Sequence, residues 1–160
     1  MKKLFLAAIL AVMGIANASA QFEKGKFYGG ASASGLGISY SETTKFAFGF
    51  DALGGYLFAN NWMAMAELGY NFHNSDTHSV SAGLRCRYYI VQNGLFLSLG
   101  AKYLHEFSSY NDFFLTPEVG YCFFLNRNVT LEPSIYYNMS LTDFGNKSRF
   151  GLKVGFGFFF

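Results

Sequence analysis

The sequence FGLKVGFGFFF at residues 150–160 decides the fold. Large apolar side chains occupy every second position, whereas the positions between them hold glycine, lysine and Phe159. The apolar positions are Phe150, Leu152, Val154, Phe156, Phe158 and Phe160. Successive side chains of a strand point to opposite faces, so this stretch predicts a strand with one wholly apolar face. A soluble domain gains little from such a strand, whereas a barrel that presents an apolar band to lipid requires it.

The same alternation recurs upstream and predicts further strands, although the first of them is rich in Gly, Ala and Ser and its register is not fixed. The expected strands are Phe27–Gly37, Phe46–Phe58, Trp62–Phe72, Val80–Ile90, Leu95–Tyr103, Phe113–Phe123, Val129–Leu141 and Arg149–Phe160. Pro117 and Pro133 fall inside two of them, where proline removes a hydrogen-bond donor, so we expect a bulge or a local break at each. The pattern predicts an all-β fold, an antiparallel up-and-down transmembrane barrel of about eight strands.

The connections between the expected strands alternate between short and long. Tight turns are expected at Ala59–Asn61, Gln92–Gly94 and Asn126–Asn128, and longer loops at Ser39–Lys45, His73–Ser79, His105–Asp112 and Thr142–Ser148. Transmembrane barrels have short periplasmic turns and longer outer loops. The alternation therefore places both ends of the barrel domain on the periplasmic side.

The first twenty residues have the pattern of a secretory signal peptide. Lys2 and Lys3 form a basic start, residues 4–15 an apolar run, and Ala18–Ala20 a small-residue cleavage site. The apolar run is shorter than the ~20 residues that a spanning helix needs. We therefore expect a signal peptide at residues 1–20 and a single barrel domain at residues 21–160.

The composition narrows the class of protein. Charged residues make up 14% of the chain and aromatic residues 20%, whereas ordinary soluble domains have about 25% charged residues. Such a chain has too few charges to cover a soluble globule. The net charge is only +2, which gives no electrostatic reason to expect a nucleic-acid partner.

Eight charged side chains within the expected strands share the face opposite the aromatic residues. They are Asp51, Glu67, Arg85, Arg87, Lys102, Glu118, Glu132 and Lys153. An eight-stranded barrel is just wide enough for side chains to fill it, and enclosed opposite charges can pair. Alternation alone does not say which face is inside, so a soluble lipocalin-like carrier with inward aromatic residues remains an alternative. The low charge fraction, the signal peptide and Phe160 favour aromatic residues that face lipid.

Few residues suggest chemistry. His73, His78 and His105 lie in or beside expected loops with Asp76 and Asp112, but their spacing matches no metal-ligand motif. Ser75, Asp76 and His78 could form a hydrolytic triad only within one short loop that lacks a nucleophile elbow. Parity places Cys86 outward and Cys122 inward, so no disulfide is expected. We expect no catalytic residue, no metal site and no cofactor.

The alternating strands, the signal peptide and the aromatic residues Phe156, Phe158 and Phe160 together resemble the small outer-membrane β-barrel proteins of Gram-negative bacteria. The resemblance implies residence in the cell outer membrane, contact with outer-membrane lipid, and an assembly signal in those three phenylalanines for the barrel-assembly machinery. It also implies interfacial girdle residues, here Tyr56, Trp62, Tyr70, Tyr88, Tyr89, Tyr103 and Tyr137. No catalytic motif accompanies it.

The leading functional hypothesis is a non-enzymatic integral outer-membrane barrel with a structural or surface-interaction role through its outer loops, its lumen filled by the charged side chains. A narrow pore or a transporter of small hydrophobic molecules is the first alternative, and the soluble secreted carrier is the second. The sequence identifies no surface ligand.

Overall fold

A computed structural model describes residues 22–34, 47–73, 77–90, 94–106, 110–142 and 144–160. The strands are β1 (Phe27–Ser34), β2 (Ala47–Ala59), β3 (Trp62–His73), β4 (Thr77–Tyr89), β5 (Leu95–Glu106), β6 (Tyr110–Tyr121), β7 (Phe123–Phe124), β8 (Val129–Ser140) and β9 (Arg149–Phe159), and the short helix α2 spans Phe144–Lys147. Within these residues, no helix is long and apolar enough to cross a membrane.

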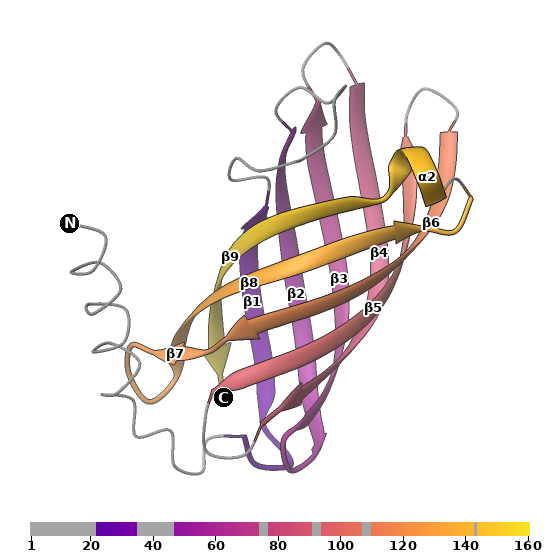
Figure 1. The fold of residues 1–160 in the computed structure, drawn as a ribbon. Coiled ribbons are helices and arrows are strands. Elements are labelled where there is room, and N and C mark those ends of the chain that lie inside the picture. Colours follow the sequence, from indigo (N-terminus) through magenta and orange to yellow (C-terminus); the bar gives the residue numbers. More distant parts are fainter. Residues whose placement is uncertain (1–21, 35–46, 74–76, 91–93, 107–109, 143) are drawn as a thin grey trace, which may run out of the picture.

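The strands form one closed antiparallel barrel (Figure 1). Neighbours in sequence pair from β1 to β6, β8 pairs with β9, and β9 returns to pair with β1. The ring closes because β8 also pairs with both β6 and β7. Since β6 and β7 are two parts of one strand of the wall, the barrel has eight strands, which confirms the predicted fold class.

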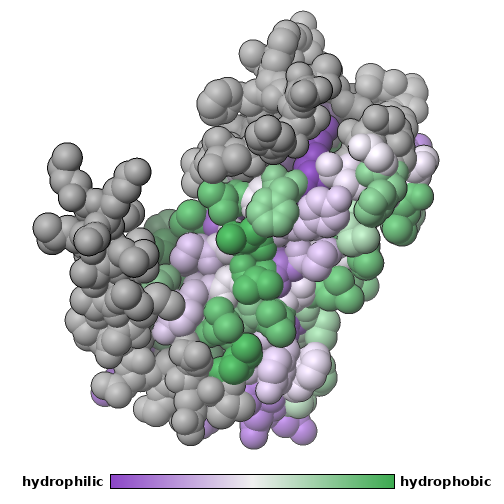
Figure 2. All heavy atoms as spheres, in the orientation of Figure 1, coloured by the Kyte–Doolittle hydropathy of each residue, from purple (hydrophilic) through white to green (hydrophobic). Residues whose placement is uncertain are grey.

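Side chains alternate between the two sides of the barrel as the sequence predicts. On β2, Phe50 and Tyr56 are exposed on the outside, whereas Asp51, Leu53 and Leu57 are buried inside. Figure 2 shows apolar residues along the middle of the visible outer face and hydrophilic residues at its lower end. The aromatic face therefore points outward, which overturns the alternative of a carrier with inward aromatic residues.

Both prolines interrupt the same junction, which we call the seam, between β8 and the pair β6 and β7. The pairing across the seam keeps a constant register, from the pair of Phe114 and Ser140 to the pair of Phe124 and Thr130. In this described part of the wall, backbone pairs are missing beside Pro117 and again beside Pro133, which lies across the seam from Cys122 and its neighbour. On their other sides, Pro117 still pairs with β5 and Pro133 still pairs with β9. Each proline thus causes a local break and not a register-shifting bulge, because proline has no N–H to donate.

The expected alternation of short turns and long loops is only partly correct. β4 begins at Thr77 and β5 continues to Glu106, so only three residues separate β3 from β4 and β5 from β6, whereas five separate β4 from β5. Polar residues at the ends of these strands still pair, such as Asn71 with Ser79 and His105 with Asn111, which extends the hairpins beyond the apolar band. The expected strand residues 35–37 and Phe46 lie outside the described part of the chain.

Candidate functional site: the barrel lumen

The eight charged residues singled out from the sequence all point into the barrel. Seven of them are buried, and Lys102 is half-buried. They come from seven strands, namely β2, β3, β4, β5, β6, β8 and β9. Alternation puts them on the inner face, and closure of the wall then brings side chains from opposite strands within reach of one another.

Arg85 on β4 joins two carboxylates at the centre of the lumen. Its Nη2 and Nε atoms donate to Glu67 Oε2 at 2.5 and 2.9 Å. Its Nη1 atom donates to Glu118, which lies on β6. The guanidinium group can hold both acids because its donors form a rigid planar fork.

Glu118 links this cluster to two more bases. Lys153 Nζ on β9 donates to Glu118 Oε2 at 2.9 Å, and Arg87 Nη2 lies 3.9 Å from Glu118 Oε1. Arg87 in turn donates to Glu132 Oε2 on β8 at 2.6 Å. Three acids and three bases therefore form one continuous network across the lumen, and the paired charges offset part of the cost of burial.

Neutral groups complete the surroundings of Glu132 and Arg87. The hydroxyl groups of Tyr28 and Thr130 donate to the two oxygens of Glu132 at 3.0 and 2.8 Å. The guanidinium carbon of Arg87 lies 3.9 Å from the ring centre of Phe96, a favourable cation–π distance. Nothing in the strand alternation ranks Tyr28, Thr130 or Phe96 above other inward residues, so the sequence did not identify them.

Asp51 and Lys102 lie in the same interior but outside this chain of ion pairs. The hydroxyl of Ser32 donates to Asp51 Oδ2 at 3.4 Å. Lys102 is attracted electrostatically to both Glu67 and Asp51. With these two residues, the eight charged residues predicted to face inward comprise four acids and four bases, so the formal charges of this set cancel.

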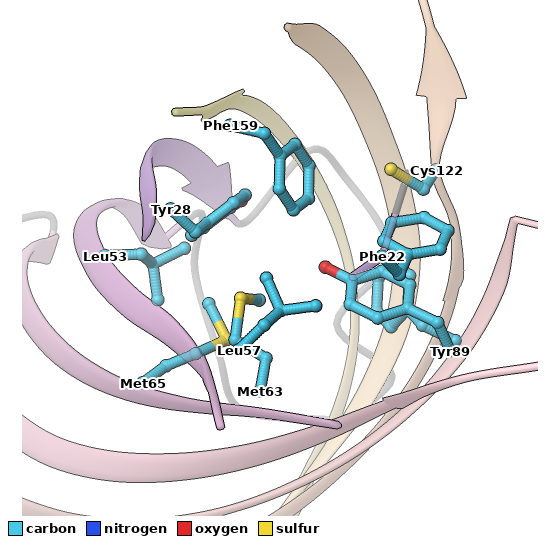
Figure 3. Packing of buried hydrophobic residues seen from close by; sticks show 10 residues of the cluster. Phe22, Tyr28, Leu53, Leu57, Met63, Met65, Tyr89, Cys122 and Phe159 are labelled. Carbon is cyan, nitrogen blue, oxygen red and sulfur yellow. The ribbon is translucent and has the colours of Figure 1, made fainter. Parts of the chain in front are cut away.

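The lumen at the turn end is filled by an apolar cluster that the sequence did not indicate. Its inward side chains are Tyr28, Leu53, Leu57, Met63, Met65, Tyr89, Phe96, Cys122 and Phe159, joined by Phe22. Figure 3 shows Phe22 among them, stacked on Tyr89 with ring centres 3.7 Å apart. Phe22 precedes β1, so no strand period pointed to it. Tyr89 is fully buried here, and its expected place in the outer girdle is wrong.

The other chemical candidates are not drawn together in the described residues. His78 is exposed and lies against Tyr70, with ring centres 5.9 Å apart, while His105 Nδ1 is 2.6 Å from Asn111 Oδ1. Ser75 and Asp76 lie outside the described residues. Cys86 is exposed and Cys122 buried, and both are free thiols. Among the described residues, no three His, Cys, Asp or Glu side chains are arranged to hold a metal.

A closed wall with aromatic residues outside and ion pairs inside defines a transmembrane β-barrel. A family model described as "outer membrane protein beta-barrel domain" matches residues 5–160. The chain belongs to this family, and it is an outer-membrane protein of the Gram-negative type. The expected localisation in the outer membrane is confirmed by this match.

Solved structures agree on the fold. The N-terminal β-barrel domain of Pseudomonas aeruginosa OprF has a TM-score of 0.66 at 12% identity, covering 86% of this chain and 98% of that one. Neisserial surface protein A has a TM-score of 0.58 at 18% identity, covering 86% of this chain and 98% of that one. The outer membrane protein OprG of P. aeruginosa has a TM-score of 0.57 at 17% identity, covering 89% of this chain and 99% of that one. No curated protein matches the sequence.

Proposed function

We propose that this protein is a non-enzymatic structural component of the outer membrane, with a closed lumen and a surface-interaction role at its outer end. The observation that carries the proposal is the continuous network that joins Glu67, Arg85, Glu118 and Lys153 across the barrel. Long paired side chains at the centre of an eight-stranded barrel leave no room for a water-filled channel.

The apolar cluster at the turn end adds a second closure. Phe22 contacts Tyr89, Phe124 and Phe159 through ring distances of 3.7 to 5.7 Å. The backbone holds it there, because the N–H of Asn61 donates to the carbonyl oxygen of Phe22 at 2.8 Å. A solute would have to displace both the apolar cluster and the ion pairs to cross the barrel.

The outer end supports the surface role. Leu141 and Phe144, just after β8 and in α2, are exposed apolar side chains, and α2 lies at the end of the barrel opposite the tight turns (Figure 1). Contiguous exposed apolar groups often mark interaction sites. If the surface interaction joins cells to one another, cells that express the protein should sediment, and replacing both residues by serine should reduce this sedimentation without changing membrane insertion. Equal sedimentation of variant and wild type would remove the role from these residues.

Conductance in planar bilayers tests the closed lumen. We expect the purified wild type to conduct poorly. A variant with Glu67, Arg85, Glu118 and Lys153 all changed to alanine removes two acids and two bases, so it empties the centre without changing net charge, and we expect it to conduct more. A large, stable single-channel conductance from the wild type would overturn the proposal and make transport the leading function.

A further inference from the structure

The outer face of the barrel carries a groove of about 820 Å³ that the lumen does not explain. Most of its lining residues are outward-facing and apolar, and they are Trp62, Cys86, Tyr88, Leu97, Leu99, Pro117, Val119, Ile135, Tyr137 and Phe150. Five of these residues come from β6, β8 and β9, and these strands lie nearest the reader in Figure 1.

The strand register explains the direction of the groove. One wall follows a single row of paired residues, which runs from Trp62 through Tyr88, Leu97 and Val119 to Ile135. The next row runs from Cys86 through Leu99 to Pro117 and, beyond the break, from Tyr137 to Phe150. Six strands spaced by ~4.8 Å give the groove a length of about 24 Å.

The lining fits an uncharged, apolar occupant. Three inward residues, Ser98, Glu118 and Tyr136, reach its floor. Glu118 is the only carboxylate among the residues that line this groove, and it is already paired with Arg85 and Lys153. A charged ligand would therefore meet no opposite charge, whereas a hydrocarbon chain would contact side chains on several sides.

The position of the groove identifies the source of that chain. The residues lie on the face that a family of outer-membrane barrels turns toward lipid. At the turn end, Trp62 and Tyr88 pack together with ring centres 4.8 Å apart, and aromatic residues of this kind mark the level of the lipid headgroups. Short turns of such barrels lie on the periplasmic side.

We propose that the groove binds an acyl chain of a phospholipid from the periplasmic leaflet, with its headgroup beside Trp62 and Tyr88. The chain gains little from leaving water, because it starts in the bilayer. It gains packing contacts, which drive association within membranes. Elsewhere on the outer face, the side chains of Leu68 and Leu84 are 64% and 72% exposed. Pro117 and Tyr137 in the groove are half-buried by the protein itself.

The single tryptophan of the chain makes the proposal testable, because Trp62 lines the groove. The protein in detergent micelles is titrated with a phospholipid whose chains carry bromine, a contact quencher of tryptophan fluorescence. We expect saturable quenching of Trp62 that excess unbrominated phospholipid reverses. Quenching that rises in simple proportion to the lipid content of the micelle, without saturation, would overturn the proposal.

Matched substitutions locate the site. Cys86→Phe fills the groove, whereas Leu84→Phe adds bulk on the same face of β4 outside it. We expect Cys86→Phe to weaken apparent lipid binding several-fold and Leu84→Phe to leave it unchanged. Ile135→Phe and Leu131→Phe repeat the comparison on β8, and heat-dependent gel mobility checks that each variant is folded. Equal effects of the two substitutions within each pair would overturn the assignment. A wild-type dimer that Cys86→Phe abolishes would also overturn it, because the occupant of the groove would then be a second copy of the chain.

Discussion

Thr116 and Asn138 are hydrogen-bonded across the first break in the seam, where Thr116 Oγ1 donates to Asn138 Oδ1 at 2.9 Å. The constant register makes these two residues the partners whose ladder pair is missing beside Pro117. At the second break, the Cys122 thiol lies 3.7 Å from Glu132 Oε1 in the same relation. Inward side chains thus bridge both places where proline interrupts the wall.

The bridge predicts a specific loss of stability. Thr116→Val keeps the shape of the side chain but removes the donor to the half-buried Asn138 oxygen, which should lower the free energy of unfolding by about 1 kcal/mol. Thr116→Ser keeps the hydroxyl and is the matched control. Urea unfolding in phospholipid vesicles, followed by heat-dependent gel mobility, measures both. Equal stability of the valine and serine variants would show that the bridge contributes nothing.

The face of each charged residue could be predicted from the sequence because a strand has a local period of two. Phe50 and Asp51 are neighbours in the chain, yet one is exposed and the other buried. The same rule gave the eight strands and the closed barrel. The parity of β4 places Tyr89 inside, opposite Tyr88, and this parity decides its position although a tyrosine near a strand end is typical of the interfacial girdle.

The ion-pair partners could not be predicted, because they depend on how the wall closes. Arg85 and Glu118 are 33 residues apart and meet only because β4 and β6 curve around one lumen. No periodicity of the sequence predicts the position of Phe22 in the lumen, because this residue precedes β1. The connections between β3 and β4 and between β5 and β6 are shorter than the sequence predicts, because polar residues such as Asn71 and Ser79 continue to pair above the apolar band.

Breaking the ion pair of Glu132 should be more costly than removing both partners. Glu132→Leu leaves Arg87 buried without its closest carboxylate, and such a loss costs about 3–5 kcal/mol when the group is fully buried. The double variant Glu132→Leu with Arg87→Met replaces the pair by apolar groups, and we expect it to be more stable than the single variant. Urea unfolding of both compares them. A double variant less stable than Glu132→Leu alone would contradict the uncompensated charge as the cause.

Phe22 should control access to the turn end of the lumen. In a Cys86→Ser background, Cys122 is the remaining thiol of the chain, and it belongs to the same cluster as Phe22. Phe22→Ala should destabilise the barrel by about 3 kcal/mol and raise the rate at which a water-soluble maleimide labels Cys122. The exposed Glu23→Ala is the control. An unchanged labelling rate in Phe22→Ala would show that this side chain does not close the lumen.

Substitutions of Phe160 can distinguish an assembly signal from an effect on the stability of the barrel. Its backbone closes the barrel against β1, because its N–H donates to the carbonyl oxygen of Phe27 at 2.9 Å, while its side chain is 74% exposed on the lipid side. Phe160→Asp keeps that backbone bond. A charge near the membrane interface costs only about 0–1 kcal/mol, so stability measured after refolding in vesicles should change little.

If the barrel-assembly machinery reads Phe156, Phe158 and Phe160, the effect in cells should be much larger than this small loss of stability. We expect Phe160→Asp to lower the amount of protein in the outer membrane several-fold and to leave aggregates in the periplasm, whereas Phe160→Tyr should insert normally. Quantitative blotting of separated membrane and periplasmic fractions measures this. Normal membrane levels of Phe160→Asp would rule out the signal, and equal losses in cells and in vesicles would reduce it to an effect on stability.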